Sequence, residues 1–393
     1  LWTKMKDKAK HRGYCDFSAY MLSSLIRRRE ISAVEALEST LARIAAVDGH
    51  PGTLDDGDMT PADERTVHAF ITLTEERARA QAQEVDRQLA AGEDPGPLAG
   101  VPVTIKDIFC VQGTPSTAGS RILSNFVAPN TATPAARMEA AGAVTLGKVN
   151  LDEFSFGSST ESSAFKPNTR NPWDPTRVPG GSSGGSAAAV DAGEGALSLG
   201  TDTAGSIRQP AAFCGVVGLN PTYGRVSRYG LIAFGSSLDC PGPVARDVKD
   251  AAMMLNVIAG PDPRDGTAAN VPVPDYLTSL EGGVRGLRIG LSPDYFRITF
   301  FDTESGELHQ EPIALEIEDA VMSAAGDLAA MGADIVSDVP MPHTKYGIPV
   351  YFVVSRVEAA SNLHRYDGVK YGYRTPDQVA DLSEMYRKSR AEG

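Results

Sequence analysis

Short apolar runs typical of strands alternate with segments of helical periodicity along this chain, and this alternation restricts its fold more than any other feature. Between Gly100 and Thr201 the strand-like runs are GVPVTIKD, GAVTLGK and GALSLGT, with helical segments at 133–141 and 183–192 between them. Such alternation is typical of α/β folds, in which apolar strands are buried between helices. The sequence therefore predicts an α/β fold with a central, mixed, twisted β-sheet flanked by helices on both faces.

The same pattern continues toward both ends of the chain. Ser32 lies at the start of one amphipathic segment, where its hydroxyl is expected to accept a hydrogen bond from an early helix amide. Further helices are expected at 17–29, 33–47, 75–91, 248–259 and 313–331. Further strands are expected in HAFITL, in ADIVSDV and, as a buried strand, in GLRIGLS.

We find no convincing linker and no repeat with a period of 20 to 50 residues. The expected organisation is a basic N-terminal arm at 1–13 and a single domain over 14–393, with a lid-like insertion around 296–311. The last segment, LSEMYRKSRAEG, resembles a helix cut short. We therefore expect the chain to be truncated at its C-terminus.

Composition excludes several classes of function. The net charge of −13 argues against a protein that grips a nucleic-acid backbone over a wide surface by itself. The four cysteines lie far apart without a CxxC pair, and there is neither a signal-type segment nor an 18-residue apolar run, so we expect a cytoplasmic protein with no membrane contact. The six histidines are scattered without an HExxH motif, so no metal site is expected.

Two short motifs suggest other enzymes but fail in context. GAVTLGKV matches a phosphate-binding loop as far as Lys148, but Val149 stands where a metal-binding hydroxyl is needed and the inner residues favour a strand. GSSGG matches a nucleophile elbow with Ser183 at its centre. The preceding NPWDPTRVPG contains three prolines and cannot be the buried strand that such an elbow follows.

Two Gly/Ser-rich runs, VPGGSSGGSAAAV and LGTDTAGSIRQPAAFCG, remain to be explained. Runs of this composition are usually flexible linkers. Here each passes directly into small apolar residues, which places the glycines between buried elements. A linker is therefore excluded.

An acyl-transfer site is the physical alternative. The small residues of TDTAGS favour a tight turn that exposes successive amides, from Thr203 through Ala204 and Gly205 to Ser206, with the Ser206 hydroxyl outward. Such a turn supplies a nucleophile and an oxyanion hole together. Lys106 is the only cation in an apolar strand-like run, and burial lowers the pKa of a lysine toward the range of a general base.

Together these segments resemble the amidase signature family. The block GGSSGGSAAAV…GTDTAGSIRQPAAFCGVVGLNPTYGRVSRYGL carries the family mark, and VPVTIKD resembles the strand of the family's lysine. The resemblance implies that Ser206 is the acyl-accepting nucleophile, that Ser182, 24 residues earlier, is a bridging serine after a cis peptide bond, and that Lys106 is the base. Ser183 is then expected to support the triad through hydrogen bonds.

Within that family the chain is most similar to the A subunits of glutamyl-tRNA(Gln)/aspartyl-tRNA(Asn) amidotransferases, on VNLDEFSFGSSTESSAF, RNPWD and EAASNLHRYDGVKYGYR. This resemblance implies a glutamine-hydrolysing subunit that passes ammonia to partners of the B and C type in a heterotrimer. Such a chain would need no cofactor of its own, while ATP, Mg²⁺ and the tRNA would be bound by the partner subunit. A stand-alone amidase for small or aryl amides and a non-catalytic scaffold remain as alternatives.

The chain departs from the family pattern at several positions. Ala204 replaces a glycine and excludes a positive φ without strain, Asn220 replaces a lysine, and Asp191 lies in a helix that the family fills with small residues. Tyr351 matches a substrate-contacting tyrosine, although a place in a helix core explains it equally well. The family's substrate-binding arginine and aspartate lie in a C-terminal portion that this chain does not reach.

Overall fold

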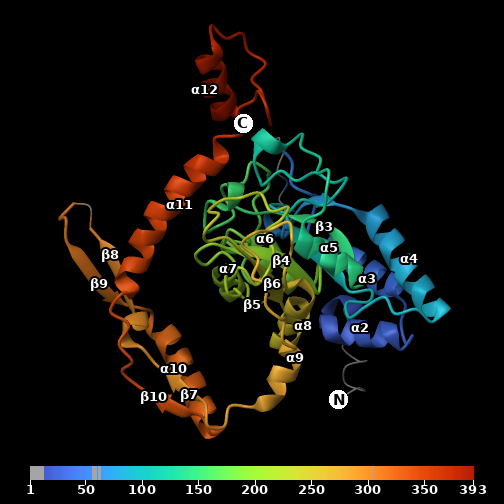
Figure 1. Ribbon diagram of the computed structural model, residues 1–393, viewed down its shortest axis with the longest axis vertical. Coiled ribbons are helices and arrows are strands. Elements are labelled where there is room, and N and C mark those ends of the chain that lie inside the picture. The colour runs from blue at the N-terminus through green and yellow to red at the C-terminus, as the bar shows by residue number, and fades with distance from the viewer. Residues whose placement is uncertain (1–12, 55–59, 61–62, 303) are drawn as a thin grey trace. The chain divides into compact units, whose positions relative to one another are not determined.

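The computed structural model describes residues 13–54, 60, 63–302 and 304–393. These form two compact units, the first made of residues up to 277 together with 358–393 and the second of residues 278–357 (Figure 1). Except for Gly13, the expected basic arm lies outside the described residues. The single domain over 14–393 stays a prediction, and each unit is described by itself.

The first unit contains a six-stranded sheet with the order β1-β3-β2-β4-β6-β5. The central strands β3, β2 and β4 run parallel, whereas β1, β6 and β5 join antiparallel to their neighbours. The strands are β1 (Phe70–Leu73), β2 (Pro102–Lys106), β3 (Val144–Val149), β4 (Leu197–Asp202), β5 (Val217–Gly218) and β6 (Cys240–Ala245). The expected α/β fold with a central mixed sheet flanked by helices is confirmed.

Helices surround this sheet, and most of them lie where their periodicity predicted (Figure 1). The longer ones are α2 (Ala19–Arg27), α3 (Ala33–Val47), α4 (Glu75–Ala91), α5 (Thr133–Ala140), α6 (Gly184–Ala192) and α8 (Val248–Ile258). The helix α12 (Leu382–Glu392) belongs to the same unit and packs against residues 121–123. The short helix α7 (Arg208–Phe213) also belongs to this unit, and α9 (Tyr276–Ser279) begins in it. Ser32 caps α3 as expected, because its hydroxyl accepts the Glu35 N–H at 3.0 Å and the Glu35 carboxylate accepts the Ser32 N–H in return.

The centre of the sheet forms the core of the first unit. Every residue of β2, β3 and β4 is buried, and α6, rich in alanine, is buried along almost its whole length. Small side chains let α6 pack closely on the sheet, and a Cβ at Gly185 would lie 2.4 Å from the Asn150 carbonyl oxygen. The Gly/Ser-rich run is therefore part of the core and not a linker.

The second unit contains two small sheets, one long helix and the greater part of another. β7 (Arg288–Gly290) pairs in parallel with β10 (Asp334–Val336), and β8 (Arg297–Phe301) forms an antiparallel hairpin with β9 (Leu308–Pro312). The helix α10 (Leu315–Ala330) follows the hairpin, and α11 (Gly347–Leu363) leads back to the first unit.

The strand expected in GLRIGLS is present as β7, but the expectation that it is buried is wrong. Arg288 and Gly290 are exposed, because β7 has a single partner strand in a two-stranded sheet. The expected insertion around 296–311 is the β8–β9 hairpin, and its role as a lid stays a prediction. None of the helices in the described ranges has both the length and the apolar character needed to cross a membrane.

Candidate active site

Lys106 ends strand β2, and its side chain is completely buried. Its Nζ atom forms hydrogen bonds with the Ser182 hydroxyl at 2.7 Å and with the Thr201 hydroxyl at 2.8 Å. Both contacts are far from Lys106 in the sequence, by 76 and 95 residues. The buried amine is therefore held between two hydroxyl groups.

Parallel pairing of β2 with β4 brings Lys106 and Thr201 together. Ile105 is paired with Leu199 in this ladder, so Lys106 and Thr201 both lie at the carboxyl ends of their strands. The carboxyl ends of parallel strands meet at one edge of a sheet, which is where α/β proteins usually place their sites. The fold thus gathers the polar groups of two strands at one place in the core.

Burial lowers the pKa of Lys106 to about 7, because a low-dielectric interior disfavours the charged ammonium form. The carboxylates of Asp152, Asp239 and Asp202 act in the opposite direction and limit the fall of the pKa. The neutral amine is thus available near physiological pH. A neutral lysine has a lone pair that can accept a proton, as a general base requires.

Ser182 follows a cis peptide bond with Gly181, as the family resemblance implied. Its side chain is completely buried, and its carbonyl accepts the Asp152 N–H at 3.3 Å. Gly181 lies so close to the neighbouring segment that a Cβ there would be 2.1 Å from Asp152 Oδ2 and 2.8 Å from Ser159 N. Only glycine fits this close approach.

The turn from Thr203 to Ser206 follows β4 directly. Within the described part of the chain, none of its four backbone N–H groups donates a hydrogen bond. The Ser206 hydroxyl has no hydrogen-bond partner there either, while the Ser206 carbonyl accepts the Ser183 N–H at 3.1 Å. This bond places the backbones beside Ser182 and Ser206 side by side, but the structure shows no contact between their hydroxyls. The nucleophile and oxyanion-hole roles stay predictions.

Asp202 and Arg208 fix both ends of this turn. The Asp202 carboxylate accepts the N–H groups of Ile207 and Arg208 at 3.1 and 3.3 Å and pairs with the Arg208 guanidinium at 3.0 Å. The same guanidinium donates to the Ala204 carbonyl at 3.0 Å. These bonds hold the turn from both sides, while its own four amides have no acceptor among the described residues.

Two further residues predicted to belong to the site, Ser183 and Tyr351, lie in different units and have different contacts. The Ser183 hydroxyl donates to the Thr201 carbonyl at 3.0 Å and accepts the Thr201 N–H at 3.3 Å, so it ties α6 to β4. Tyr351 lies on α11 in the second unit, with its ring 5.7 Å from that of Phe352. The supporting role of Ser183 and the substrate contact of Tyr351 stay predictions.

The departures from the family pattern have specific surroundings. Ala204 is exposed, and it is not among the described non-glycine residues with positive φ, so its backbone does not require glycine. The Asn220 Oδ1 atom is buried and has no hydrogen-bond partner among the described residues. Asp191 lies half-buried on α6, and burial raises the pKa of its carboxyl.

The rejected phosphate-loop motif lies in strand β3, as its composition indicated. Lys148 is completely buried and forms an ion pair with Asp107 at 2.7 Å, with further bonds to the Ser116 hydroxyl and the Pro115 carbonyl. The ion pair and the two hydrogen bonds compensate the buried charge of Lys148, so its ammonium is occupied by the protein.

Sequence reasoning missed Thr201, Asp152 and Asp239 as neighbours of the site. Asp239 accepts the Thr203 hydroxyl at 2.7 Å and the N–H groups of Phe234 and Gly235, and burial raises the pKa of its carboxyl. The only signal in the sequence for these contacts was that Thr201 is the first residue of TDTAGS, at the end of a strand-like run. Among the described residues, no group of three or more His, Cys, Asp or Glu side chains is placed to hold a metal.

The sequence is similar to a known protein family and to known members of it. The model of the Amidase family matches residues 61–393. The A subunit of glutamyl-tRNA(Gln) amidotransferase from Carboxydothermus hydrogenoformans is 50% identical over 376 residues, which cover 96% of this chain and 71% of that relative. The A subunit of the same name from a Synechococcus species is 52% identical over 364 residues, which cover 93% and 68%.

Solved structures of similar proteins have the same fold. The A subunit of glutamyl-tRNA(Gln) amidotransferase from Thermotoga maritima superimposes with a TM-score of 0.72 at 35% identity, over 96% of this chain and 70% of that one. The native peptide amidase of Stenotrophomonas maltophilia superimposes with a TM-score of 0.77 at 32% identity, over 96% and 72%.

Proposed function

Because the chain belongs to the amidase family, we propose that it is the glutamine-hydrolysing A subunit of a tRNA-dependent amidotransferase. In this role it releases ammonia for the conversion of glutamyl-tRNA(Gln) or aspartyl-tRNA(Asn) to the amidated form. One observation carries the chemistry: the Lys106 amine is completely buried, has a pKa of about 7, and lies 2.7 Å from the Ser182 hydroxyl.

In the proposed reaction, neutral Lys106 takes the proton of Ser182, while Ser182 takes the proton of Ser206. The Ser206 oxygen then attacks the side-chain carboxamide carbon of glutamine. The relay requires the Ser206 hydroxyl to turn toward Ser182 when the substrate binds. The free N–H groups of Thr203 to Ser206 are the donors available to the oxyanion that develops.

Collapse of the tetrahedral intermediate breaks the carbon–nitrogen bond. The proton held by Lys106 returns through Ser182 to the departing nitrogen, which leaves as ammonia, and a γ-glutamyl ester remains on Ser206. Water then attacks the ester carbon and gives its proton to the same relay. Glutamate is released, and the Ser206 hydroxyl is restored.

The proposed complex divides the work between subunits. The relatives are named as subunits, and the net charge of −13 is unsuited to binding tRNA over a wide surface. We therefore assign the tRNA, ATP and Mg²⁺ to a partner of the B type, with a C-type subunit completing the heterotrimer. We also place the protein in the cytoplasm, which suits its four buried cysteine thiols.

Glutamine hydrolysis measured on the chain alone and with B-type and C-type subunits tests this proposal. We expect ammonia release from glutamine to rise at least about tenfold when the partners are added, and Ser206→Ala to remove it. Turnover of small or aryl amides by the chain alone, with no response to the partners, would identify a stand-alone amidase. No hydrolysis by the wild-type chain beside active partners would indicate a scaffold.

A further inference from the structure

A second site lies in the first unit, in a cleft of about 600 Å³. It is formed by the C-terminal part of α3, the segment before β1, the 170–175 loop and the end of α6. Its lining residues include neither Lys106, Ser182 nor Ser206. We call it the arginine cleft and define it by the side chains Arg43, Arg65, Arg170, Asn171, Trp173 and Asp191.

The three arginines give the cleft a local positive charge in a chain whose net charge is −13. None of them forms an ion pair with a described acidic residue: Arg43 donates to the Ala192 carbonyl at 2.7 Å and Arg170 to the Pro175 carbonyl at 3.0 Å. Asp191 is the single acidic residue of the lining, and burial raises the pKa of its carboxyl. Arg43 lies near the carboxyl groups of Asp191 and Glu194, whereas Arg65 and Arg170 have no carboxylate partner among the described residues. Guanidinium groups without such a partner attract an anion.

Arg170 provides a further sign of a missing partner. Its Nε atom is buried and has no acceptor among the described residues. A buried donor without an acceptor loses its hydration without compensation. The protein therefore satisfies this guanidinium incompletely, and an anion in the cleft would contact it through the part of the side chain that lines the cleft.

Trp173 presents an aromatic face beside these arginines and is 73% exposed. The ring is held in place, because its Nε1–H donates to the Cys214 carbonyl at 3.0 Å and its backbone N–H donates to Asn171 Oδ1 at 3.0 Å. Gly215 makes room for it, since a Cβ there would lie 3.2 Å from the indole nitrogen. A fixed, exposed indole is a ready surface for stacking.

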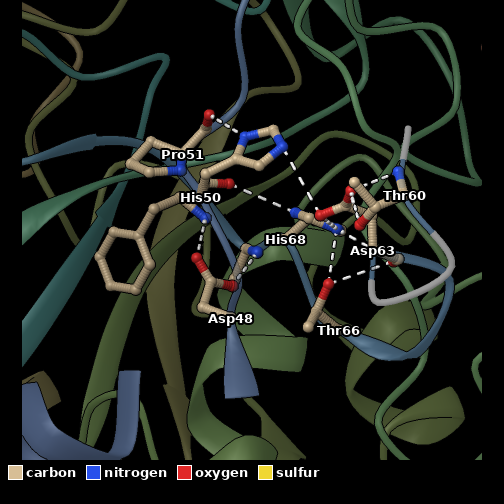
Figure 2. A network of polar contacts seen from close by, with 9 residues as sticks. Asp48, His50, Pro51, Thr60, Asp63, Thr66 and His68 are labelled. Carbon is tan, nitrogen blue, oxygen red and sulfur yellow. Dashed lines mark hydrogen bonds and ion pairs between the residues drawn. The ribbon is translucent and has the colours of Figure 1, made fainter. Parts of the chain in front are cut away.

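A polar network fixes the wall that carries Arg65 (Figure 2). Asp63 accepts the N–H and the hydroxyl of Thr60 at 2.8 and 2.7 Å, and the Thr66 hydroxyl is 2.6 Å from His68 Nε2. Figure 2 shows the rings of His50 and His68 turned toward Asp63. Because Arg65 lies between Asp63 and Thr66, its backbone is held before any ligand binds.

From these features we propose that the arginine cleft binds a free mononucleotide, with its phosphate on Arg43, Arg65 and Arg170 and its base stacked on Trp173. The volume lies in the range of small-ligand sites, which is about 300 to 1,000 Å³. Arginine suits phosphate because its donors match the phosphate oxygens. An acidic peptide would leave the exposed indole unused, and a longer RNA would require a basic surface beyond the cleft.

The binding of AMP and ATP to the chain without partner subunits tests the proposal and does not depend on glutamine hydrolysis. We expect both nucleotides to bind in calorimetric titrations and to quench tryptophan fluorescence. Adenosine and inorganic phosphate, which each supply half of the ligand, should bind at least about tenfold more weakly. The chain has two tryptophans, so loss of the quenching in Trp173→Phe would assign the signal to the cleft.

Arg65→Gln and Arg170→Gln should each weaken AMP binding about tenfold or more. Arg177→Gln is the matched control, since Arg177 is on the same loop, is exposed and lies outside the lining; it should leave binding unchanged. Far-UV circular dichroism and urea unfolding of each variant report whether the chain is folded, independently of glutamine hydrolysis. Three outcomes would overturn the proposal. AMP and ATP could fail to bind at millimolar concentration, or could bind both arginine variants as tightly as the wild type. A single-stranded RNA could also bind where mononucleotides do not.

Discussion

The Lys106 amine and the Ser182 hydroxyl lie 2.7 Å apart at the carboxyl edge of the sheet, although 76 residues separate them in the chain. Both side chains are completely buried. Burial keeps water from the amine and lowers the pKa of Lys106. The Ser182 hydroxyl then offers a short route for a proton to or from the amine. Activity, its pH dependence and the stability of the surrounding backbone should all respond to this contact.

Glutaminase activity should depend on pH through Lys106. The pKa of about 7 lies below the ordinary lysine value of 10.5, so the neutral, active amine predominates above pH 7 and the charged, inactive form below it. We expect kcat/KM to fall about tenfold per pH unit below pH 7 and to be level above it. A profile that inflects near the ordinary lysine pKa would contradict the lowering of the Lys106 pKa by burial.

Removing either serine hydroxyl should stop the reaction. Ser206→Ala deletes the nucleophile and Ser182→Ala interrupts the proton relay, so each should lower kcat by at least about a thousandfold. Ser158→Ala, in the exposed neighbouring segment, is the control and should keep full activity. Mass spectrometry of protein quenched during turnover should find the glutamyl ester in the wild type and the control only. Activity above about one tenth in Ser206→Ala would exclude this serine as the nucleophile.

Thr201→Val should shift the pH profile. The Thr201 hydroxyl lies 2.8 Å from Lys106 Nζ and stabilises the charged ammonium by accepting a hydrogen bond. Without it the pKa of Lys106 should fall further, so the acid limb of the profile should move to lower pH. Thr201→Ser keeps the hydroxyl and should restore the wild-type profile. A loss of activity at every pH with an unchanged inflection would reduce Thr201 to a packing role.

Ala204→Gly should change activity little. The sequence suggested that alanine strains the oxyanion turn, but Ala204 is not among the described residues with positive φ. Its side chain is exposed, so the glycine variant should be less stable by about 0.5 to 1 kcal/mol through the greater freedom of the unfolded chain. Glutaminase assays and urea unfolding measure the two effects. An increase in kcat of about tenfold or more would show that the turn needs glycine after all.

Gly181→Ala should destabilise the fold. The added methyl group would lie 2.1 Å from Asp152 Oδ2 and 2.9 Å from Thr160 N, and the buried backbone cannot move away without disturbing Ser182. We expect the free energy of unfolding in urea to fall by about 1 to 3 kcal/mol. Gly266→Ala is the control, because no atom lies within 4 Å of a Cβ at that position. Equal stability of the two variants would contradict the packing around Ser182.

The family, the α/β class and most helices and strands followed from the sequence by itself. Ser32 before a periodic segment predicted α3 and its cap, and the apolar runs around Lys106 and Lys148 predicted β2 and β3. These features are local, because periodicity and capping involve residues a few positions apart. The same local logic failed for β7, whose exposure depends on how many strands its sheet contains.

The family resemblance already related Ser182 to Lys106, but only the tertiary structure placed Thr201 at the Lys106 amine and brought the arginines together beside Trp173. The strand order decided the contacts of the amine, since β4 lies next to β2 although two α-helices and a strand separate them in the chain. Burial then decided the fall in the pKa of Lys106, because desolvation depends on every group packed around the amine. Both effects come from residues far apart in sequence, and no spacing of letters along the chain encodes them.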